Sequence, residues 1–121
     1  DVGTITDEMK SIISRANYLV IEANYDPQML ETGPYPRYLK DRIKNGHGHL
    51  SNTQCAQALA ENFTHTLKHV WLCHLSQENN KPELALNTIS QTLEMTGIRV
   101  GEDVKVEVLR RTLPTGIFSL T

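Results

Sequence analysis

Four acidic and histidine side chains could together do chemistry in this sequence: Asp1, Glu22, His49 and His74. Each is expected to lie where a strand ends or in a loop beside the start of a helix. Carboxylates and imidazoles are the usual protein ligands of Zn²⁺ and Mn²⁺, and the two together also make proton-transfer pairs. These residue types therefore indicate either a metal centre or acid–base catalysis.

Each of these residues also has a structural explanation when it is taken alone. Glu22 could be a hydrogen-bonded acid at a strand end, His49 a loop histidine, and His74 a satisfied histidine of the core. Only the four residues together favour a catalytic or metal-binding role over a structural one.

The remaining histidines give weaker signals. His47-Gly48-His49 has the H-x-H spacing of a ligand pair, but in a glycine-containing loop that spacing is not specific. His65 and His69 flank the turn between a helix and a strand, and both are expected to lie on the surface.

Two short apolar strands must position the candidate residues. Residues 67–73 form an apolar run that ends directly before His74, and residues 18–21 form another that ends at Glu22. In open α/β sheets, ligands bind at the carboxyl ends of the strands. The polar loop from Ser76 to Asn80 could shape a binding site at this edge.

Helix signals alternate with these strands. The sequence Ser51-Asn52-Thr53-Gln54 matches a capping box and predicts a helix over residues 52–63. Further elements are expected at these places: helices after Thr6, from Pro27, over residues 38–44 and from Pro82 to Gly97, and a strand over residues 104–108. Asn79 and Asn80 could simply cap the helix that opens at Pro82. Helices that alternate with strands indicate a layered α/β fold.

Composition and charge are those of an ordinary globular domain. The 121 residues can bury one modest core, and 39% of them are hydrophobic and 21% charged. The formal net charge of −2 gives no global basic field for nucleic acid, so phosphate recognition must be local. No apolar stretch approaches the roughly 18 residues of a membrane span, and no signal-peptide pattern is present. Cys55 and Cys73 fit the reducing cytoplasm, and nothing favours a disulfide between them.

Four sequence blocks form a specific pattern in combination, although none would suffice alone. They are residues 1–4 (DVGT), 20–26 (VIEANYD), 48–52 (GHLSN) and 74–80 (HLSQENN). In this order they resemble the metallo-β-lactamase-fold hydrolases, and look closest to the YycJ/WalJ-type branch, a group of bacterial nucleases. The segment Gly33-Pro34-Tyr35-Pro36, with Leu39-Lys40 and Arg42-Ile43 after it, is similar to the same branch. The resemblance implies that residues 1–121 are the C-terminal half of a metallo-β-lactamase-type αββα sandwich.

The resemblance also implies a role for each candidate residue. Asp1 matches an aspartate that bridges two divalent metal ions, Zn²⁺ or Mn²⁺, and His74 matches the last histidine ligand. Glu22 and His49 match a catalytic pair in which the histidine protonates the leaving oxygen and the glutamate orients it. A metal-bridged hydroxide would attack the phosphorus atom.

Four further residues are expected to bind substrate phosphate: Ser51, Asn52, Ser76 and Asn79. The helix start at Ser51 and Asn52 offers backbone N–H groups suited to a phosphate oxygen. Ser76 and Asn79 belong to the polar loop after His74.

The chain departs from the family pattern in its metal ligands. It contains no H-x-H-x-D-H motif, which in the family precedes the bridging aspartate together with another ligand histidine. Two ligands cannot hold a dinuclear centre. We therefore expect the missing ligands in an upstream half outside this chain, and we expect the chain alone to be inactive.

The leading interpretation is a metal-dependent phosphodiesterase or exonuclease that acts on the ends of DNA or RNA. One alternative is a hydrolase of a lactam or thioester with the same fold, which suits the Glu22/His49 pair less well. A second alternative is a non-catalytic interaction or dimerisation module. Three points stay open: whether the substrate is DNA or RNA, whether the metal is Zn²⁺, Mn²⁺ or Fe, and whether the protein is a homo-oligomer.

Overall fold

The computed structural model describes residues 5–44, 49–109 and 118–120, in which helices alternate with strands. The elements are α1 (Asp7–Arg15), β1 (Tyr18–Glu22), α2 (Pro27–Thr32), α3 (Arg37–Lys44), α4 (Asn52–Asn62), β2 (His69–Cys73), α5 (Pro82–Met95), β3 (Lys105–Val108) and β4 (Phe118–Leu120). The predicted α/β class is therefore confirmed.

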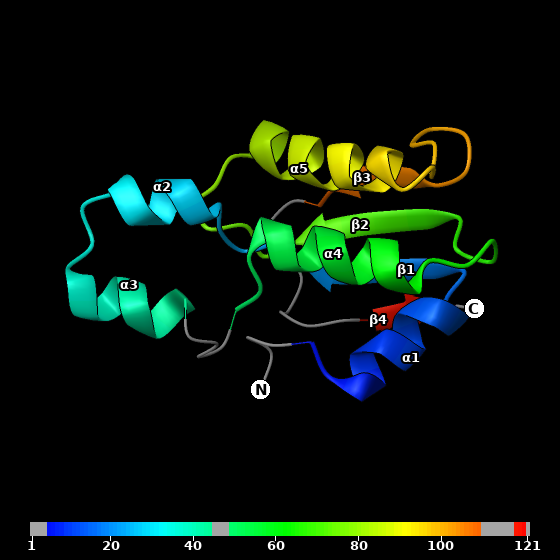
Figure 1. Ribbon diagram of the computed structural model, residues 1–121, viewed down its shortest axis with the longest axis horizontal. Helices are drawn as coiled ribbons and strands as arrows, with labels where there is room; N and C mark the ends of the chain where they lie inside the picture. Colours follow the sequence, from blue (N-terminus) through cyan, green and yellow to red (C-terminus); the bar gives the residue numbers. More distant parts are fainter. Residues whose placement is uncertain (1–4, 45–48, 110–117, 121) are drawn as a thin grey trace.

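The strands form one sheet in the order β3-β2-β1-β4, in which β1, β2 and β3 are parallel and β4 is antiparallel. β1 and β2 are the central strands, and they pair from Tyr18 with His69 to Glu22 with Cys73. Their carboxyl ends therefore lie side by side. Helices α2 and α3 lie beyond this end of the sheet (Figure 1).

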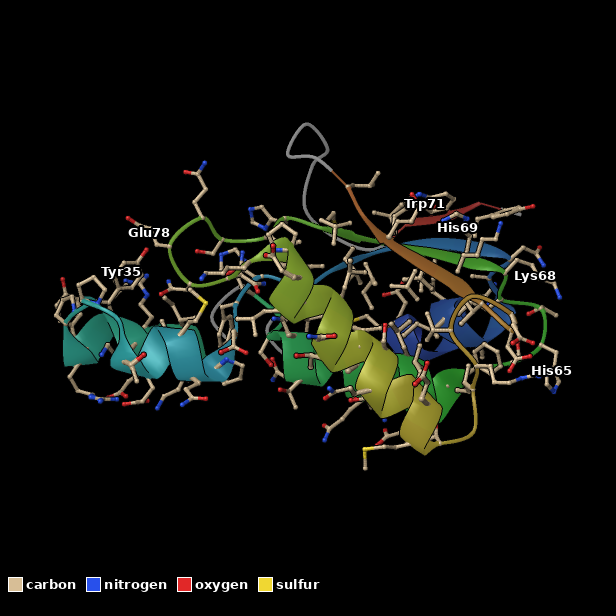
Figure 2. All side chains as sticks on the ribbon, turned by 90° about the horizontal axis from the view of Figure 1, so that it is seen from above. Tyr35, His65, Lys68, His69, Trp71 and Glu78 are labelled. Atoms are coloured by element: carbon tan, nitrogen blue, oxygen red, sulfur yellow. The ribbon has the colours of Figure 1, made fainter. Side chains whose placement is uncertain are left out.

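Helices α1, α4 and α5 cover one face of the sheet (Figures 1 and 2). Alternate residues of a strand point to the same face, and Leu19, Ile21, Val70 and Leu72 are accordingly fully buried. Each such side chain contributes roughly 1.5–3 kcal/mol relative to an exposed one. The core therefore holds β1 and β2 rigidly at the point where the candidate residues follow them.

Capping residues place the helices that flank the sheet. The hydroxyl of Thr6 accepts a hydrogen bond from the Met9 N–H at 3.1 Å, which starts α1. At the start of α4 the predicted capping box is complete. The Ser51 hydroxyl accepts from the Gln54 N–H at 3.0 Å, and the Gln54 side chain accepts from the Ser51 N–H at 2.8 Å. Helix α5 starts at Pro82 and stops before Gly97, whose φ is +88°, as predicted.

The segment before His74 differs from its prediction in two ways. The apolar run begins at residue 67, but β2 begins only at His69, because the N–H of Lys68 donates to the Asn17 carbonyl at 2.8 Å instead of to a strand. His69 is half-buried and not a plain surface residue. Its ring stacks on Trp71, its neighbour in Figure 2, with centroids 3.9 Å apart. Its Nε2 lies 2.7 Å from a Glu107 carboxylate oxygen. His65 is exposed, as predicted.

Cys55 and Cys73 are free and buried. Burial raises the pKa of both thiols, that of Cys73 to about 11, and the nearby Glu22 charge acts in the same direction. Both thiols are therefore neutral at physiological pH. Among the described helices, none has the length and apolar character needed to cross a bilayer.

Candidate functional site

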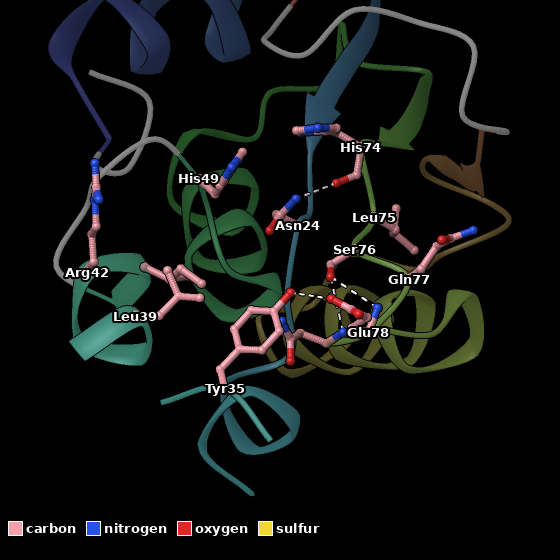
Figure 3. Close-up of a pocket in the computed structure, with 12 residues that line it drawn as sticks. Asn24, Tyr35, Leu39, Arg42, His49, His74, Leu75, Ser76, Gln77 and Glu78 are labelled. Carbon is pink, nitrogen blue, oxygen red and sulfur yellow. Dashed lines mark hydrogen bonds between the residues drawn. The ribbon is translucent and has the colours of Figure 1, made fainter. Parts of the chain in front are cut away.

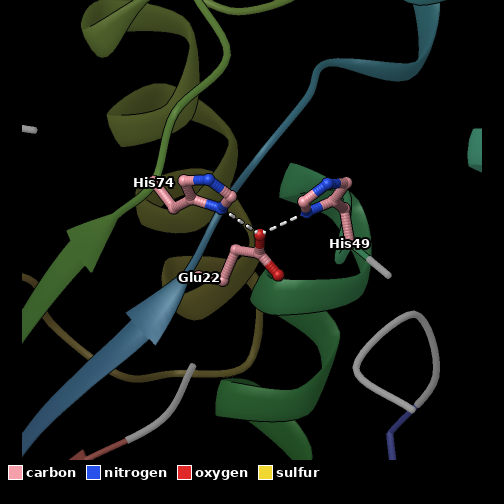
Figure 4. Close-up of side chains that lie close together, drawn as sticks. All are labelled: Glu22, His49 and His74. Carbon is pink, nitrogen blue, oxygen red and sulfur yellow. Dashed lines mark hydrogen bonds and ion pairs between the residues drawn. The ribbon is translucent and has the colours of Figure 1, made fainter. Parts of the chain in front are cut away.

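Glu22, His49 and His74 come together at the carboxyl ends of β1 and β2. Both histidines contact one carboxylate oxygen: the Nδ1 atoms of His49 and His74 lie 2.7 Å and 2.6 Å from Oε2 of Glu22 (Figure 4). The Glu22 side chain is 1% exposed, whereas each histidine side chain is 36% exposed. A buried carboxylate thus holds two imidazoles that reach the surface.

The fold explains why these three side chains meet. Glu22 ends β1 beside Cys73, the last residue of β2, and His74 follows directly. His49 lies just before the capped start of α4, and the N–H of the next residue, Leu50, donates to Oε1 of Glu22 at 3.2 Å. Both oxygens of Glu22 therefore have hydrogen-bond donors, which offsets the cost of burying a carboxylate.

The shared carboxylate determines which ring nitrogens remain for chemistry. A carboxylate oxygen only accepts, so the Nδ1 atom of each histidine carries a hydrogen and donates it to Glu22. Each Nε2 atom is on the far side of its ring (Figure 4). A carboxylate that accepts the Nδ1 hydrogen in this way orients a metal-binding histidine. It also orients a histidine that transfers a proton. The arrangement can serve either purpose at His49 and at His74.

The main chain of His74 adopts the left-handed conformation, with φ of 59°. This conformation is uncommon outside glycine and has to be stabilised by its surroundings. Asn24 provides two hydrogen bonds at this point: its Nδ2 donates to the His74 carbonyl at 2.7 Å, and its own carbonyl accepts from the Ser76 N–H at 2.8 Å. Asn24 therefore fixes the sharp turn that carries the His74 imidazole to Glu22.

A cavity of about 710 Å³ opens beside the two histidines (Figure 3). One wall is α3, which contributes Leu39, Arg42 and Ile43 at the spacing of a single helix face. The facing wall is the loop of residues 75–79 after β2. Tyr35 lies at the end of the cavity opposite the histidines (Figure 3). The volume is within the range of small-ligand sites.

The wall formed by α3 is tied to the rest of the site. The Tyr35 hydroxyl donates a hydrogen bond to the Glu78 carboxylate, and this bond raises the pKa of Tyr35. On the outer side, Arg37 and Lys44 pair with Glu31 and lower its pKa to about 2. These contacts join α2 and α3 to each other, and the segment between them to the loop that forms the facing wall.

Ser51 and Asn52, predicted to bind phosphate, have partners inside the protein. The Ser51 N–H donates to Gln54 Oε1, and the Asn52 N–H donates to the Tyr25 carbonyl, both at 2.8 Å. The Asn52 side chain is fully buried and exchanges two hydrogen bonds of 2.9 Å with Asn80. The N–H groups expected to be available to a phosphate are thus occupied, and phosphate binding by these two residues stays a prediction without geometric support.

The structure also corrects the interpretation that Asn79 and Asn80 cap α5. The residue that caps α5 is Lys81, and its side chain makes no capping hydrogen bond. The Asn80 side chain donates instead to Asn52 and, at 3.0 Å, to the Ala23 carbonyl. Asn80 therefore joins the end of β1 to the start of α4.

Ser76 and Asn79, the other predicted phosphate ligands, both line the cavity. The Ser76 hydroxyl accepts from the Asn79 N–H at 3.1 Å and so shapes the loop itself. Asn79 is almost fully buried, and its carbonyl accepts from the Asp26 N–H at 2.8 Å. Both residues are placed where a substrate could reach the loop, and their binding role stays a prediction.

Three residues of the site were missed by sequence reasoning: Asn24, Tyr35 and Arg42. The first two stand in segments whose asparagine, glycine and proline content indicates only turns. For Arg42, the available signal was its position between Leu39 and Ile43 on one face of a predicted helix. That face could have been expected to contact another part of the protein.

The donor set of the site fits a divalent metal ion. Glu22, His49 and His74 can each offer one ligand atom, and these atoms lie within 4.8 Å of one another. While Nδ1 of both histidines is bonded to Glu22, the nitrogen atoms that remain for a metal ion are the two Nε2 atoms. Nitrogen and carboxylate oxygen donors suit Zn²⁺ and Mn²⁺. Asp1 and His47 lie outside the described residues. A candidate metal-binding group is thus present at the carboxyl edge of the sheet.

Two kinds of curated relatives match the chain. It is 42% identical over 117 residues to a Bacillus anthracis protein named exodeoxyribonuclease YycJ, a match that covers 97% of this chain and 44% of the relative. It is 41% identical over 106 residues to a protein of Streptococcus pneumoniae serotype 2 named exodeoxyribonuclease WalJ, covering 88% of this chain and 39% of that relative. No protein-family model and no solved structure gives a significant match.

These matches confirm the predicted resemblance to the YycJ/WalJ-type branch. The chain spans less than half the length of the curated relatives that it matches.

Proposed function

We propose that this chain, which resembles the YycJ/WalJ-type exodeoxyribonucleases, forms part of an enzyme that hydrolyses phosphodiester bonds at the ends of DNA. The observation that carries the proposal is the Glu22 carboxylate, which holds His49 and His74 together at the mouth of a nucleotide-sized cavity. The names of the relatives favour DNA over RNA as the substrate.

The two histidines have different roles in this proposal. His74 offers Nε2 as a metal ligand, and Asp1 offers its carboxylate to a centre of two Zn²⁺ or Mn²⁺ ions. When bound, these ions supply an activated water molecule and neutralise charge on the phosphate. Glu22 accepts the Nδ1 hydrogen of His74, which aims Nε2 at the metal and keeps the ring in one tautomer.

His49 acts on the leaving group. Its protonated Nε2 donates a hydrogen to the oxygen that departs when the P–O bond breaks, and the ring regains that proton from solvent. Glu22 stabilises the charged ring and fixes its orientation through Nδ1. His49 stands beside the cavity, where a scissile bond could approach it (Figure 3).

We further propose that residues 1–121 are the C-terminal half of the domain. The other half would supply the H-x-H-x-D-H ligands that this sequence lacks, and isolated residues 1–121 would be inactive. The length of the matched relatives supports this division. The buried free thiols suit an enzyme of the cytoplasm.

An activity assay on the full-length protein tests the function. With Mn²⁺ we expect release of nucleotides from end-labelled DNA, loss of release with a chelator, and no hydrolysis of the lactam nitrocefin. In His49→Ala, turnover should fall about 10²–10⁴-fold, because general acid catalysis contributes this much. His65→Ala, at an exposed histidine outside the site, is the matched control. Nitrocefin hydrolysis without DNA cleavage would contradict the proposal.

A further inference from the structure

The cavity between α3 and the loop of residues 75–79 has features that the hydrolysis step does not use. We propose that it is a subsite for the terminal nucleotide of the DNA strand, with Tyr35 and the apolar side chains of α3 against the base and Arg42 on a phosphate. This inference rests on the proposed function, because it takes the two histidines as the point of cleavage.

The position of the cavity fits a terminal nucleotide. His49 and His74 line one end of the cavity, and Tyr35 lies at the other (Figure 3). A strand whose last phosphodiester is near the histidines would therefore place its end unit along α3. The volume of about 710 Å³ can hold a single nucleotide with water around it.

The walls offer the contacts that a nucleobase requires. Leu39 and Ile43 present apolar surface from α3, and the Tyr35 ring stands beside Leu39 (Figure 3). The bond from the Tyr35 hydroxyl to Glu78 fixes the ring at the cavity edge before any ligand arrives. Stacking of a base on an aromatic ring tolerates every base, which suits removal of nucleotides regardless of sequence.

Among the cationic side chains of α3, Arg42 is the one placed to bind a phosphate. Arg37 and Lys44 of this helix pair with the Glu31 carboxylate, and Lys40 donates to the Glu31 carbonyl. None of these three cations lines the cavity. Arg42 lines the cavity, and within the described part of the chain its guanidinium pairs with no carboxylate. Glu78 is the acidic residue of the lining, and its carboxylate accepts the Tyr35 hydroxyl. An arginine with unused donors beside such a cavity is suited to a phosphate.

Calorimetric titration of the full-length protein with dAMP, and with inorganic phosphate alone, tests the subsite without relying on turnover. Tyr35→Ala should weaken dAMP binding at least about fivefold, because a base–aromatic stack is lost. Tyr35→Phe should retain dAMP binding within about twofold, because the ring remains. Arg42→Ala should weaken dAMP binding about tenfold, while Arg42→Lys recovers part of it. Tyr38→Ala, at an exposed tyrosine outside the cavity lining, is the matched control for Tyr35→Ala. Arg99→Ala, at an exposed arginine outside the lining, is the matched control for Arg42→Ala.

Steady-state hydrolysis of a DNA oligonucleotide provides the second readout. Arg42→Ala should raise KM and lower the slope of log KM against log salt by about 0.7, the value for one phosphate contact on a single strand. Tyr35→Ala should raise KM and leave this slope unchanged. Loss of kcat alone in either variant would contradict a binding role.

The outcomes separate the subsite from the proposed function. If DNA is hydrolysed but neither dAMP binding nor KM responds to Tyr35→Ala or Arg42→Ala, the subsite is wrong and the nuclease stands. If dAMP binding depends on both residues but DNA is not hydrolysed, the nuclease is wrong and the nucleotide site stands. If inorganic phosphate bound as tightly as dAMP, the proposed base contact would be wrong. If the ribonucleotide AMP bound tenfold more tightly than dAMP, the assignment of the subsite to DNA would be wrong.

Discussion

At the scale of single residues, one oxygen atom organises the site. Oε2 of Glu22 accepts from His49 and His74 at once, so a change at either ring also alters the partner of the other. The buried carboxylate is held by the Leu50 N–H as well. Asn24 has a similar organising role for the main chain, because it holds His74 in its left-handed conformation.

Replacing Asn24 should therefore weaken metal binding without removing a ligand. In Asn24→Ala of the full-length protein, the His74 carbonyl loses its donor and the turn relaxes. We expect metal affinity to fall about 10- to 100-fold, as is typical when a supporting contact of a ligand is lost. Competition with a fluorescent chelator measures this change. Asn17→Ala, which removes a comparable bond to the Thr66 carbonyl away from the site, should bind metal normally. Equal affinities in the two variants would contradict the positioning role of Asn24.

The buried thiol of Cys73 predicts a stability loss in alkali. Burial raises the pKa of Cys73 from its ordinary value of 9.0 to about 11 in the folded protein, so the thiol of the unfolded chain loses its proton first as pH rises. Stability is thus complete below pH 9.0 and declines as pH rises from there towards about 11. At the middle of this window the loss is about 1 kcal/mol. Urea unfolding at rising pH measures it, and Cys73→Ala should show a smaller decline than the wild type. Equal declines would contradict this cause.

At the scale of elements, the sequence predicts those features that depend on neighbouring residues. The capping box at Ser51, the end of β1 at Glu22 and the helix stop at Gly97 are all local signals, and the structure confirms them. The cavity could not be predicted in this way. Tyr35 and Arg42 acquire their positions only when α3 packs near the loop after β2, which follows more than thirty residues later.

The paired amides of Asn52 and Asn80 were missed for the same reason, since they join segments 28 positions apart. Replacing either asparagine by alanine removes both hydrogen bonds that the two buried amides exchange. Each single change should lower the free energy of unfolding by about 1–3 kcal/mol. The double change should cost less than the sum of the single changes, because the two shared hydrogen bonds are lost only once. Chemical denaturation of the four proteins measures the coupling, and strict additivity would contradict the pairing.

At the scale of the whole molecule, the described helices that cover the sheet all lie on one face. Figures 1 and 2 show α1, α4 and α5 on that side. The other face carries Trp71 and the exposed Tyr18, whose rings lie 6.3 Å apart. This arrangement supports the proposal that the chain forms one αβ layer of a sandwich. Under this proposal, the missing metal ligands would come from the half of the domain that forms the second layer.

The metal content of the full-length wild type, His49→Ala and His74→Ala tests most directly whether His74 is a metal ligand and His49 is not. After purification with Mn²⁺ or Zn²⁺ and removal of loosely bound ions, elemental analysis should find two ions in the wild type and in His49→Ala. In His74→Ala, which loses a ligand, we expect at least one ion to be lost. If His49→Ala lost its metal while His74→Ala kept it, the roles assigned to the two histidines would be wrong.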